Sequence, residues 1–233
     1  MCNRGEILLT NTNDSIIQTI AVLGGTGKEG SALAKRWALN GYRVIIGSRE
    51  VEKAKTAVVE MNAELGGDYL TGMSNEDAAA AAHIVVASVP YSAHRATLEG
   101  LKQHFEGKIL VDLTVPLQPP AVRTVHVPEG KSACLEAQAF LGAGVKVVAA
   151  FQNVSAEKLK DPDVYVDCDV LVCSDHADAK DDVIALVKAA GMRGIDAGPL
   201  ANAVAAESLT PVLLYINKKY GVKGSGLRIT GLE

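Results

Sequence analysis

Short apolar runs alternate with segments of helical length from Thr19 onward, and this alternation constrains the fold more than any other feature of the chain. The runs are rich in Val, Ile and Leu with almost no polar alternation, which is typical of parallel strands covered on both faces. Such an alternation predicts an α/β fold, a doubly wound parallel sheet with right-handed crossovers. The expected strands are Ile20–Leu23, Arg43–Ile46, His83–Ser88, Lys108–Asp112, Val145–Ala150, Asp169–Cys173 and Arg193–Asp196, and the expected helices are Lys28–Asn40, Val51–Leu65, Ser92–His104, Ser132–Gly142, Ala177–Ala190 and Asn202–Tyr220.

Composition narrows the class of protein. The 233 residues are 48% hydrophobic with a formal net charge of −4, which excludes a disordered chain. No block of Lys and Arg gives a sustained positive face, which argues against general nucleic-acid binding. The four cysteines form no CxxC pair, as expected of reduced cytosolic thiols. Because Ile7–Thr10 is too short for a signal peptide and Ala78–Val89 too short for a membrane helix, we expect a soluble, cytoplasmic protein.

The strand pattern divides the chain into three parts. Residues 1–18 are polar and lack periodicity, so we expect a loose N-terminal extension. Residues 19–149 are expected to form a Rossmann domain, and residues 150–233 a small C-terminal α/β domain. The proline-rich segment 113–131 predicts an irregular connection at a strand end, where binding loops tend to lie. Pro211, inside the last expected helix, should kink that helix or restart it with Thr210 as cap.

A glycine-rich turn follows the first expected strand. Gly25, Gly27 and Gly30 form a GxGxxG pattern within GGTGKEG. In a dinucleotide-binding turn the first glycine serves the tight turn, the second the approach of the backbone to a pyrophosphate, and the third the packing of helix on strand. The helix N-terminus then offers free N–H groups to the anion. The expected cofactor-binding residues here are Gly25, Thr26, Gly27, Lys28 and Glu29, and the alternative is a purely structural turn.

The end of the second strand indicates which dinucleotide is bound. A site for NAD would carry Asp or Glu about 20 residues after the glycines, but this chain has Gly47, Ser48 and Arg49. Ser48 can donate a hydrogen bond to a 2′-phosphate and Arg49 can pair with it, while Lys53 lies one helical turn further on. We therefore expect NADP(H), and the alternative is a solvated basic helix start.

The expected strand His83–Ser88, which we take as the fourth strand of a Rossmann sheet, ends with Ser88, and Val89 and Pro90 follow it. In a Rossmann sheet this strand end borders the ribose and pyrophosphate of the cofactor. An ordinary strand terminator is an equally good interpretation of these three residues.

Several longer stretches resemble one family, the NADPH-dependent reductases of coenzyme F420, a 5-deazaflavin. These stretches are GGTGKEG, GSR with the later Lys53, SNEDAAAAAHIVVASVP, AAFQNVSAEKL, DCDVLVCSD, IDAGPLANAVAAESLTPVLLYIN and the closing LRITG. The resemblance covers residues 19–233, and its specificity depends on DAGPL…ESLTP and FQNVSA.

The resemblance implies a homodimeric oxidoreductase that moves a hydride reversibly between NADPH and the deazaflavin. It assigns Thr26, Ser48, Arg49 and Lys53 to the adenosine phosphate, Val89 and Pro90 to the middle of the cofactor, and Ala150 to the nicotinamide. It places Gln152, Asn153, Val154, Leu200 and Asn202 on the deazaflavin side. Several relatives carry His where this chain has Gln152, so contacts to the deazaflavin are expected to differ there.

No catalytic side chain and no metal ligand is predicted. The Asp175–Asp182 stretch is interpreted as a solvated helix start. His94 lacks a carboxylate nearby in sequence and remains a minor candidate, and Glu207 is interpreted as a helix-face carboxylate or a substrate contact. The apolar excess of the final helix predicts a two-fold dimer; its residues are Ala203, Val204, Leu209, Val212, Leu213 and Ile216.

Two other functions remain open at this point. The chain could be an NADPH-dependent reductase of a flavin, a ferric chelate or a small carbonyl, or an NADP-sensing module without turnover. A sensor would need an output surface, and the sequence shows no appended effector domain.

Overall fold

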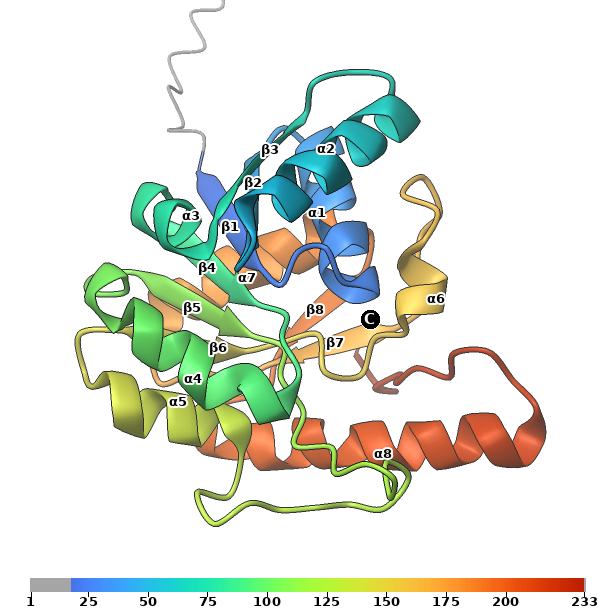
Figure 1. Cartoon of the computed structure of the whole chain (residues 1–233). Coiled ribbons are helices and arrows are strands. Elements are labelled where there is room, and N and C mark those ends of the chain that lie inside the picture. Colours follow the sequence, from blue (N-terminus) through green and yellow to red (C-terminus); the bar gives the residue numbers. More distant parts are fainter. Residues whose placement is uncertain (1–17, 233) are drawn as a thin grey trace, which may run out of the picture.

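The computed structural model describes residues 18–232 (Figure 1). Its main sheet is parallel and six-stranded, in the order β3-β2-β1-β4-β5-β6. The change of direction between β1 and β4 is that of the doubly wound Rossmann fold, and the predicted α/β class is confirmed. The strands of this sheet are β1 (Thr19–Leu23), β2 (Arg43–Ser48), β3 (Leu70–Ser74), β4 (Ile84–Ala87), β5 (Ile109–Asp112) and β6 (Lys146–Ala149).

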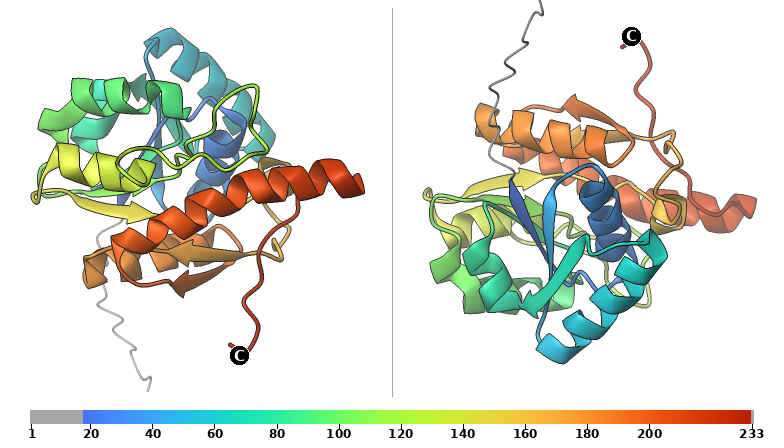
Figure 2. Two further views of the ribbon diagram at one scale, coloured as in Figure 1. Left: turned by 90° about the horizontal axis from the view of Figure 1, so that it is seen from below. Right: turned by 90° about the horizontal axis from the view of Figure 1, so that it is seen from above.

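Helices cover both faces of this sheet, which explains why its central strands are buried throughout. On one face lie α1 (Lys28–Leu39) and α2 (Val51–Leu65), together with the C-terminal part of the chain. On the other face lie α3 (Asn75–Ala81), α4 (Tyr91–Leu101) and α5 (Ala133–Leu141), with the short η1 (Lys102–His104) after α4. Figure 2 shows these layers from two sides.

The C-terminal part builds a second, smaller sheet. It consists of the parallel strands β7 (Asp169–Val172) and β8 (Arg193–Asp196), joined by α7 (Ala177–Ala189). An antiparallel bridge between Ala149 and Cys173 connects the two sheets. The remaining elements are α6 (Ala156–Leu159), η2 (Leu200–Asn202) and the long α8 (Ala203–Tyr220). The predicted small α/β unit is present, and the boundary near Ala149 stays a prediction.

Three local predictions were wrong. No element was expected between residues 66 and 82, where β3 and α3 lie; β3 reads LTGMS, an edge strand without a Val/Ile run. The one-turn helix α6 was also missed because four residues carry no periodicity. The last helix does not restart at Pro211: α8 is continuous through this buried residue, and the hydroxyl of Thr210 donates to the Gln152 carbonyl oxygen rather than capping a helix.

The predicted extension at residues 1–18 lies almost wholly outside the described residues, which begin at residue 18. Within 18–232, no helix has the length and apolar character needed to span a bilayer.

Candidate active site

The glycine-rich turn joins β1 to α1 at the carboxyl edge of the main sheet. Gly24 has a φ of +71°, and a Cβ there would lie 2.4 Å from the Ser88 carbonyl oxygen. The tight turn was predicted at Gly25; Gly25 is instead required by space, since its Cβ would lie 2.8 Å from the Val22 carbonyl oxygen. At Gly30 a Cβ would lie 3.1 Å from the Cα of Gly25 and 3.2 Å from Cγ1 of Val22 in β1, so the predicted close packing of α1 on the strand is confirmed.

The first turn of α1 borders an open cleft, and the first backbone N–H groups of a helix have no partner within the helix. Gly27 is the N-cap, and Lys28 and Glu29 follow it. Desolvation raises the pKa of Glu29, which is half-exposed, to about 8. The raised pKa weakens the negative charge of Glu29 beside the positive end of the helix, where a phosphate is favoured.

A cavity of about 550 Å³ lies where β2 ends, and it includes Ser48 and Arg49. Ser48 is buried, and its hydroxyl accepts a hydrogen bond from the backbone N–H of Glu50 at 3.2 Å. Arg49 is exposed and makes no hydrogen bond or ion pair with any residue of 18–232. The guanidinium of Arg49 is thus free to receive an anion, while Lys53 is exposed on α2 and does not line this cavity.

Asn75 is a residue of this cavity that sequence reasoning missed. It follows Ser74, the N-cap of α3. Its Oδ1 atom is buried without a hydrogen-bond partner, and a Cβ at Gly47 would lie 2.8 Å from that atom. The sequence Asn-Glu-Asp that begins α3 could have indicated the start of a helix. Because β3 was not predicted, the sequence did not indicate that this helix begins beside Ser48.

A central cleft of about 500 Å³ runs along the same edge of the sheet toward α8. It brings together residues from the glycine turn, from the ends of β4 and β5, from the segment after β6 and from α8. Predicted site residues that line it are Gly27, Lys28, Glu29, Ser88, Val89, Pro90, Gln152 and Val154, and lining residues that were not predicted are Tyr91, Ser92, Leu113, Thr114, Val115, Leu117, Pro119, Val122 and Thr210. All of the missed ones except Thr210, which lies in α8, follow β5 or begin α4, so their position after a strand was the available signal.

Gln152 is fixed in one orientation at the wall of this cleft. Its Nε2 donates to the Asp112 carbonyl oxygen at 2.7 Å and contacts the Sγ of Cys134 at 3.7 Å. Its Oε1 is buried without a partner. If the Gln152 carboxamide were rotated by half a turn, its oxygen would face the Asp112 carbonyl oxygen, and two acceptors would repel each other. Gln152 therefore offers only a hydrogen-bond acceptor to a neighbouring group.

The other predicted deazaflavin contacts do not line the cleft. Asn153 is buried, and its Nδ2 donates to the Ala206 carbonyl oxygen at 2.7 Å. Leu200 is fully buried, and the amide of Asn202 donates to the Ala197 carbonyl oxygen at 2.7 Å. Gly25, Thr26 and Ala150 also lie outside the cleft lining. The binding roles of these residues stay predictions.

A buried group of ionisable side chains lies behind the cleft wall. His94 Nε2 lies 2.7 Å from the Asp112 carboxylate; this partner is 18 residues away and comes from β5, so the sequence around His94 did not indicate it. Burial acts to lower the pKa of His94, but Asp112 outweighs it and the pKa is raised. Glu207 accepts from the backbone N–H groups of Ala133 and Cys134 at 2.8 and 3.1 Å.

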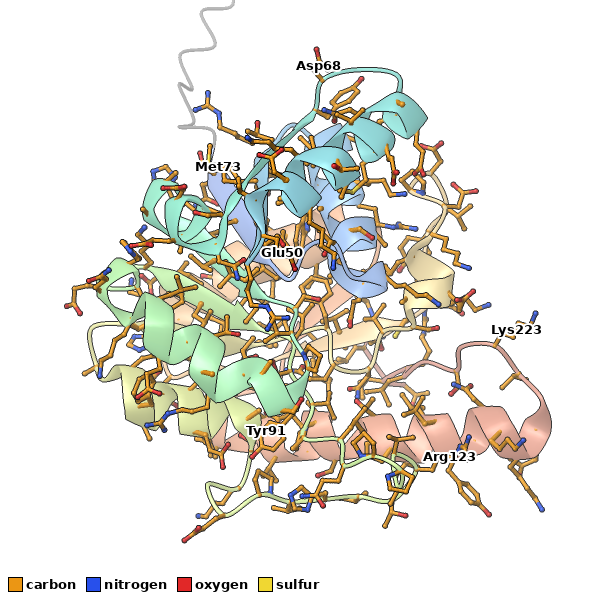
Figure 3. All side chains as sticks on the ribbon, viewed as in Figure 1. Glu50, Asp68, Met73, Tyr91, Arg123 and Lys223 are labelled. Atoms are coloured by element: carbon orange, nitrogen blue, oxygen red, sulfur yellow. The ribbon has the colours of Figure 1, made fainter. Side chains whose placement is uncertain are left out.

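Glu207 therefore serves the N-terminus of α5 rather than the cleft. Burial raises its pKa to about 7, against the opposing effect of the two backbone hydrogen bonds. Tyr91 lies at the start of α4 (Figure 3), and burial together with its hydrogen bond to Glu136 raises its pKa to about 12.

Comparison with known proteins agrees with this geometry. Residues 19–116 match the family described as NADP oxidoreductase, coenzyme F420-dependent. The chain is 41% identical to the F420-dependent NADP reductase of Methanothermobacter thermautotrophicus over 224 residues, 93% of this chain and 97% of that protein. It is 43% identical to the F420-dependent NADP reductase of Methanothermobacter marburgensis, over 91% of this chain and 98% of that protein.

Solved structures agree with these sequence matches. A putative F420-dependent NADP reductase from Arthrobacter sp. FB24 superposes with a TM-score of 0.76 at 29% identity, covering 91% of this chain and 99% of that one. Pyrroline carboxylate reductase of Plasmodium falciparum, solved with NADP bound, shares the fold with a TM-score of 0.56 at 19% identity, over 87% of this chain and 67% of that one. Because the two Methanothermobacter reductases match this chain over almost their whole length, the chain belongs to the family of F420-dependent NADP reductases.

Proposed function

We propose that this protein transfers a hydride reversibly between NADPH and coenzyme F420. The observation that carries the proposal is the continuous cleft at the carboxyl edge of the sheet, which joins the glycine turn to Gln152 and Val154. A dinucleotide on the turn would lie along this cleft, as the switch point of such sheets favours. The names of the relatives supply the acceptor.

The residues present fit NADP(H). The glycine turn leaves the backbone of α1 open to a pyrophosphate, and Arg49 beside Ser48 is free to pair with a 2′-phosphate. Bound there, the coenzyme supplies the hydride chemistry. Val89 and Pro90 support its middle, and Gln152 and Val154 shape the space in which the acceptor ring lies against it.

The side chains of this site position and shield rather than react. Gln152 directs one unpartnered oxygen, and Val154 and Leu113 provide apolar walls that exclude water. Neither an amide nor an alkyl group exchanges protons near neutral pH. We therefore assign a positioning role, and no proton transfer, to these three residues.

The direct test mixes the protein with NADPH and oxidised F420 and follows the absorbance of the deazaflavin. We expect bleaching that depends on both the protein and NADPH. Parallel reactions offer a flavin, a ferric chelate and a small carbonyl. Faster reduction of one of these, with F420 unchanged, would identify a different reductase, and no turnover with any acceptor would favour a sensing module.

Coenzyme preference is expected to depend on Arg49. Replacing Arg49 by Ala removes a charge-assisted contact of about 1.5–3 kcal/mol, which lowers kcat/KM for NADPH roughly ten- to hundredfold. NADH lacks the 2′-phosphate and should be affected little. Arg43→Ala, an exposed arginine at the other end of β2, is the matched control. Equal losses with NADPH and NADH would show that Arg49 has another role.

We also propose that the protein works as a cytoplasmic homodimer. Cys134, Cys168 and Cys173 are unpaired, buried thiols, as expected in a reducing compartment. On α8, Val212 is 42% exposed and Tyr220 is 72% exposed, which leaves apolar surface for a second copy. We expect sedimentation at micromolar concentration to give twice the mass of the 24.4 kDa chain, and Val212→Asp to shift it toward the monomer. A monomeric parent protein would contradict the dimer.

A further inference from the structure

A third cavity, of about 610 Å³, lies outside the cleft, between the segment 113–131 and the C-terminal half of α8. Arg123 and Pro120 line it from the segment, and Tyr215, Lys218 and Lys219 line it from the helix. Figures 1 and 2 show the two elements running side by side, and Figure 3 places Arg123 next to α8. We call this cavity the basic groove.

The charge around the basic groove has one sign. Residues 113–128 and 208–232 contain no Asp or Glu, although the whole chain has a net charge of −4. Arg123, Lys218 and Lys219 make no hydrogen bond or ion pair with any other residue in the described part of the chain. Lysines in the last turn of a helix also complement its dipole, but Arg123 belongs to no helix, so the dipole does not explain the cluster.

The basic groove continues the central cleft. Pro119 and Val122 line the cleft, while their neighbours Pro120 and Arg123 line the groove. Along α8, Thr210 borders the cleft and Lys218 borders the groove. Eight residues of helix separate these two, a rise of about 12 Å. A ligand with its ring in the cleft could therefore extend a side chain of about that length into the groove.

We propose that the basic groove binds the negatively charged side chain of the acceptor, through its phosphate or carboxylate groups. This inference depends on the proposed function, because the acceptor ring must lie in the cleft. Arg123 offers a planar fork to an oxyanion, and the two lysines add point charges. All of these groups are exposed, so the contact is screened by salt and adds to the binding of the ring without replacing it.

The helix face used here borders the proposed dimer face. With 3.6 residues per turn, Tyr215, Lys218 and Lys219 lie on one side of α8. Val212 lies about 60° from Tyr215 around the helix, next to Lys219, whereas Tyr220 lies about 140° from Tyr215. The sedimentation measurement below therefore distinguishes an acceptor side chain from a second copy at this part of α8.

The test combines Arg123→Gln, Lys218→Gln and Lys219→Gln in one variant. Its matched control combines Lys55→Gln, Lys160→Gln and Lys188→Gln, which removes the same charge from exposed positions on α2, directly after α6 and on α7. Fluorescence titration measures the dissociation constants of oxidised F420 and of a deazaflavin truncated at its ribityl chain, at low and high salt. NADPH is titrated in parallel.

We expect the groove variant to weaken F420 binding about tenfold at low salt, with a smaller salt dependence than the parent. Binding of the truncated deazaflavin and of NADPH should stay unchanged, and the control variant should bind all three as the parent does. If the parent protein reduces F420 and the groove variant binds F420 as tightly as the parent does, the proposed role of the groove is refuted and the proposed function stands.

Three other results would also overturn the proposal. Equal weakening of the truncated ligand would show a general distortion of the cleft. Weakening of NADPH alone would assign the groove to the dinucleotide, and a changed sedimentation mass of the variant would assign it to a second copy. A parent that neither binds nor reduces F420 would refute the proposed function and the groove together.

Discussion

Replacing Arg36 by Leu is expected to lower the free energy of unfolding by about 3–5 kcal/mol, as removal of a buried charged partner does. Arg36 lies on α1 and is 1% exposed. Its Nε donates to the Leu159 carbonyl oxygen at 3.1 Å, and its Nη1 donates to Val164 at 3.0 Å and Ala190 at 2.8 Å. Its Nη2 donates to the Asp161 carbonyl oxygen. One guanidinium thus ties α1 to two segments of the C-terminal part, the end of α6 with the residues after it and the C-terminus of α7.

The loss is large because the carbonyl oxygens lose their donors while they stay covered by protein. Arg36→Lys keeps the charge but not the planar fork, so it should recover only part of the loss. Lys35→Leu is the matched control on the same helix: Lys35 pairs with the exposed Glu64, which is worth less than about 1 kcal/mol. Urea unfolding followed by circular dichroism measures all three. A loss below about 1 kcal/mol for Arg36→Leu would mean that water replaces the guanidinium.

The parts of the fold that sequence could predict are those specified locally. β1, β2 and β4 are continuous apolar runs because helices cover both of their faces, and the glycine turn must follow β1 because Gly24 and Gly30 have no room for a side chain. The cavity at the end of β2 was predictable for the same reason, since Ser48 ends the apolar run of β2 and Arg49 follows it; its binding of the adenosine end stays a proposal.

The parts that sequence could not predict depend on pairs of distant residues. His94 and Asp112 are 18 residues apart, and the guanidinium of Arg36 reaches carbonyl groups more than 120 residues away. Neither set of contacts follows a periodicity of the sequence, so neither could be predicted from it. The cleft wall formed by Leu113 and Thr114 was missed because a proline-rich connection indicates a loop but not its course. β3 was missed because an edge strand is half exposed and needs no apolar run.

Introducing Trp at Val154 is expected to slow single-turnover hydride transfer by well over a hundredfold. Val154 is 8% exposed and lines the cleft where the acceptor ring is proposed to lie. A displacement of about 1 Å between reacting groups can already cost a hundredfold, and an indole is thicker than that. Val164→Trp, at a position that is 52% exposed, is the matched control and should leave the rate unchanged. Stopped-flow absorbance with both ligands saturating gives the rate.

Ionisable side chains should matter far less than this geometry. Glu29 lines the cleft, whereas His94 and Glu207 are buried outside its lining and Asp196 pairs with Lys180 at the surface. Glu29→Gln, His94→Gln, Glu207→Gln and Asp196→Asn should each stay within roughly a hundredfold of the parent, below the upper end of general acid–base catalysis. Because burial raises the pKa of Glu29 to about 8, its use as a proton donor would produce a break in the rate near that pH. We expect a flat profile there, since positioning alone can supply about 7–11 kcal/mol of barrier lowering. A several-thousandfold loss in one of these variants, with both ligands still bound, would instead identify acid–base catalysis and an acceptor other than a deazaflavin.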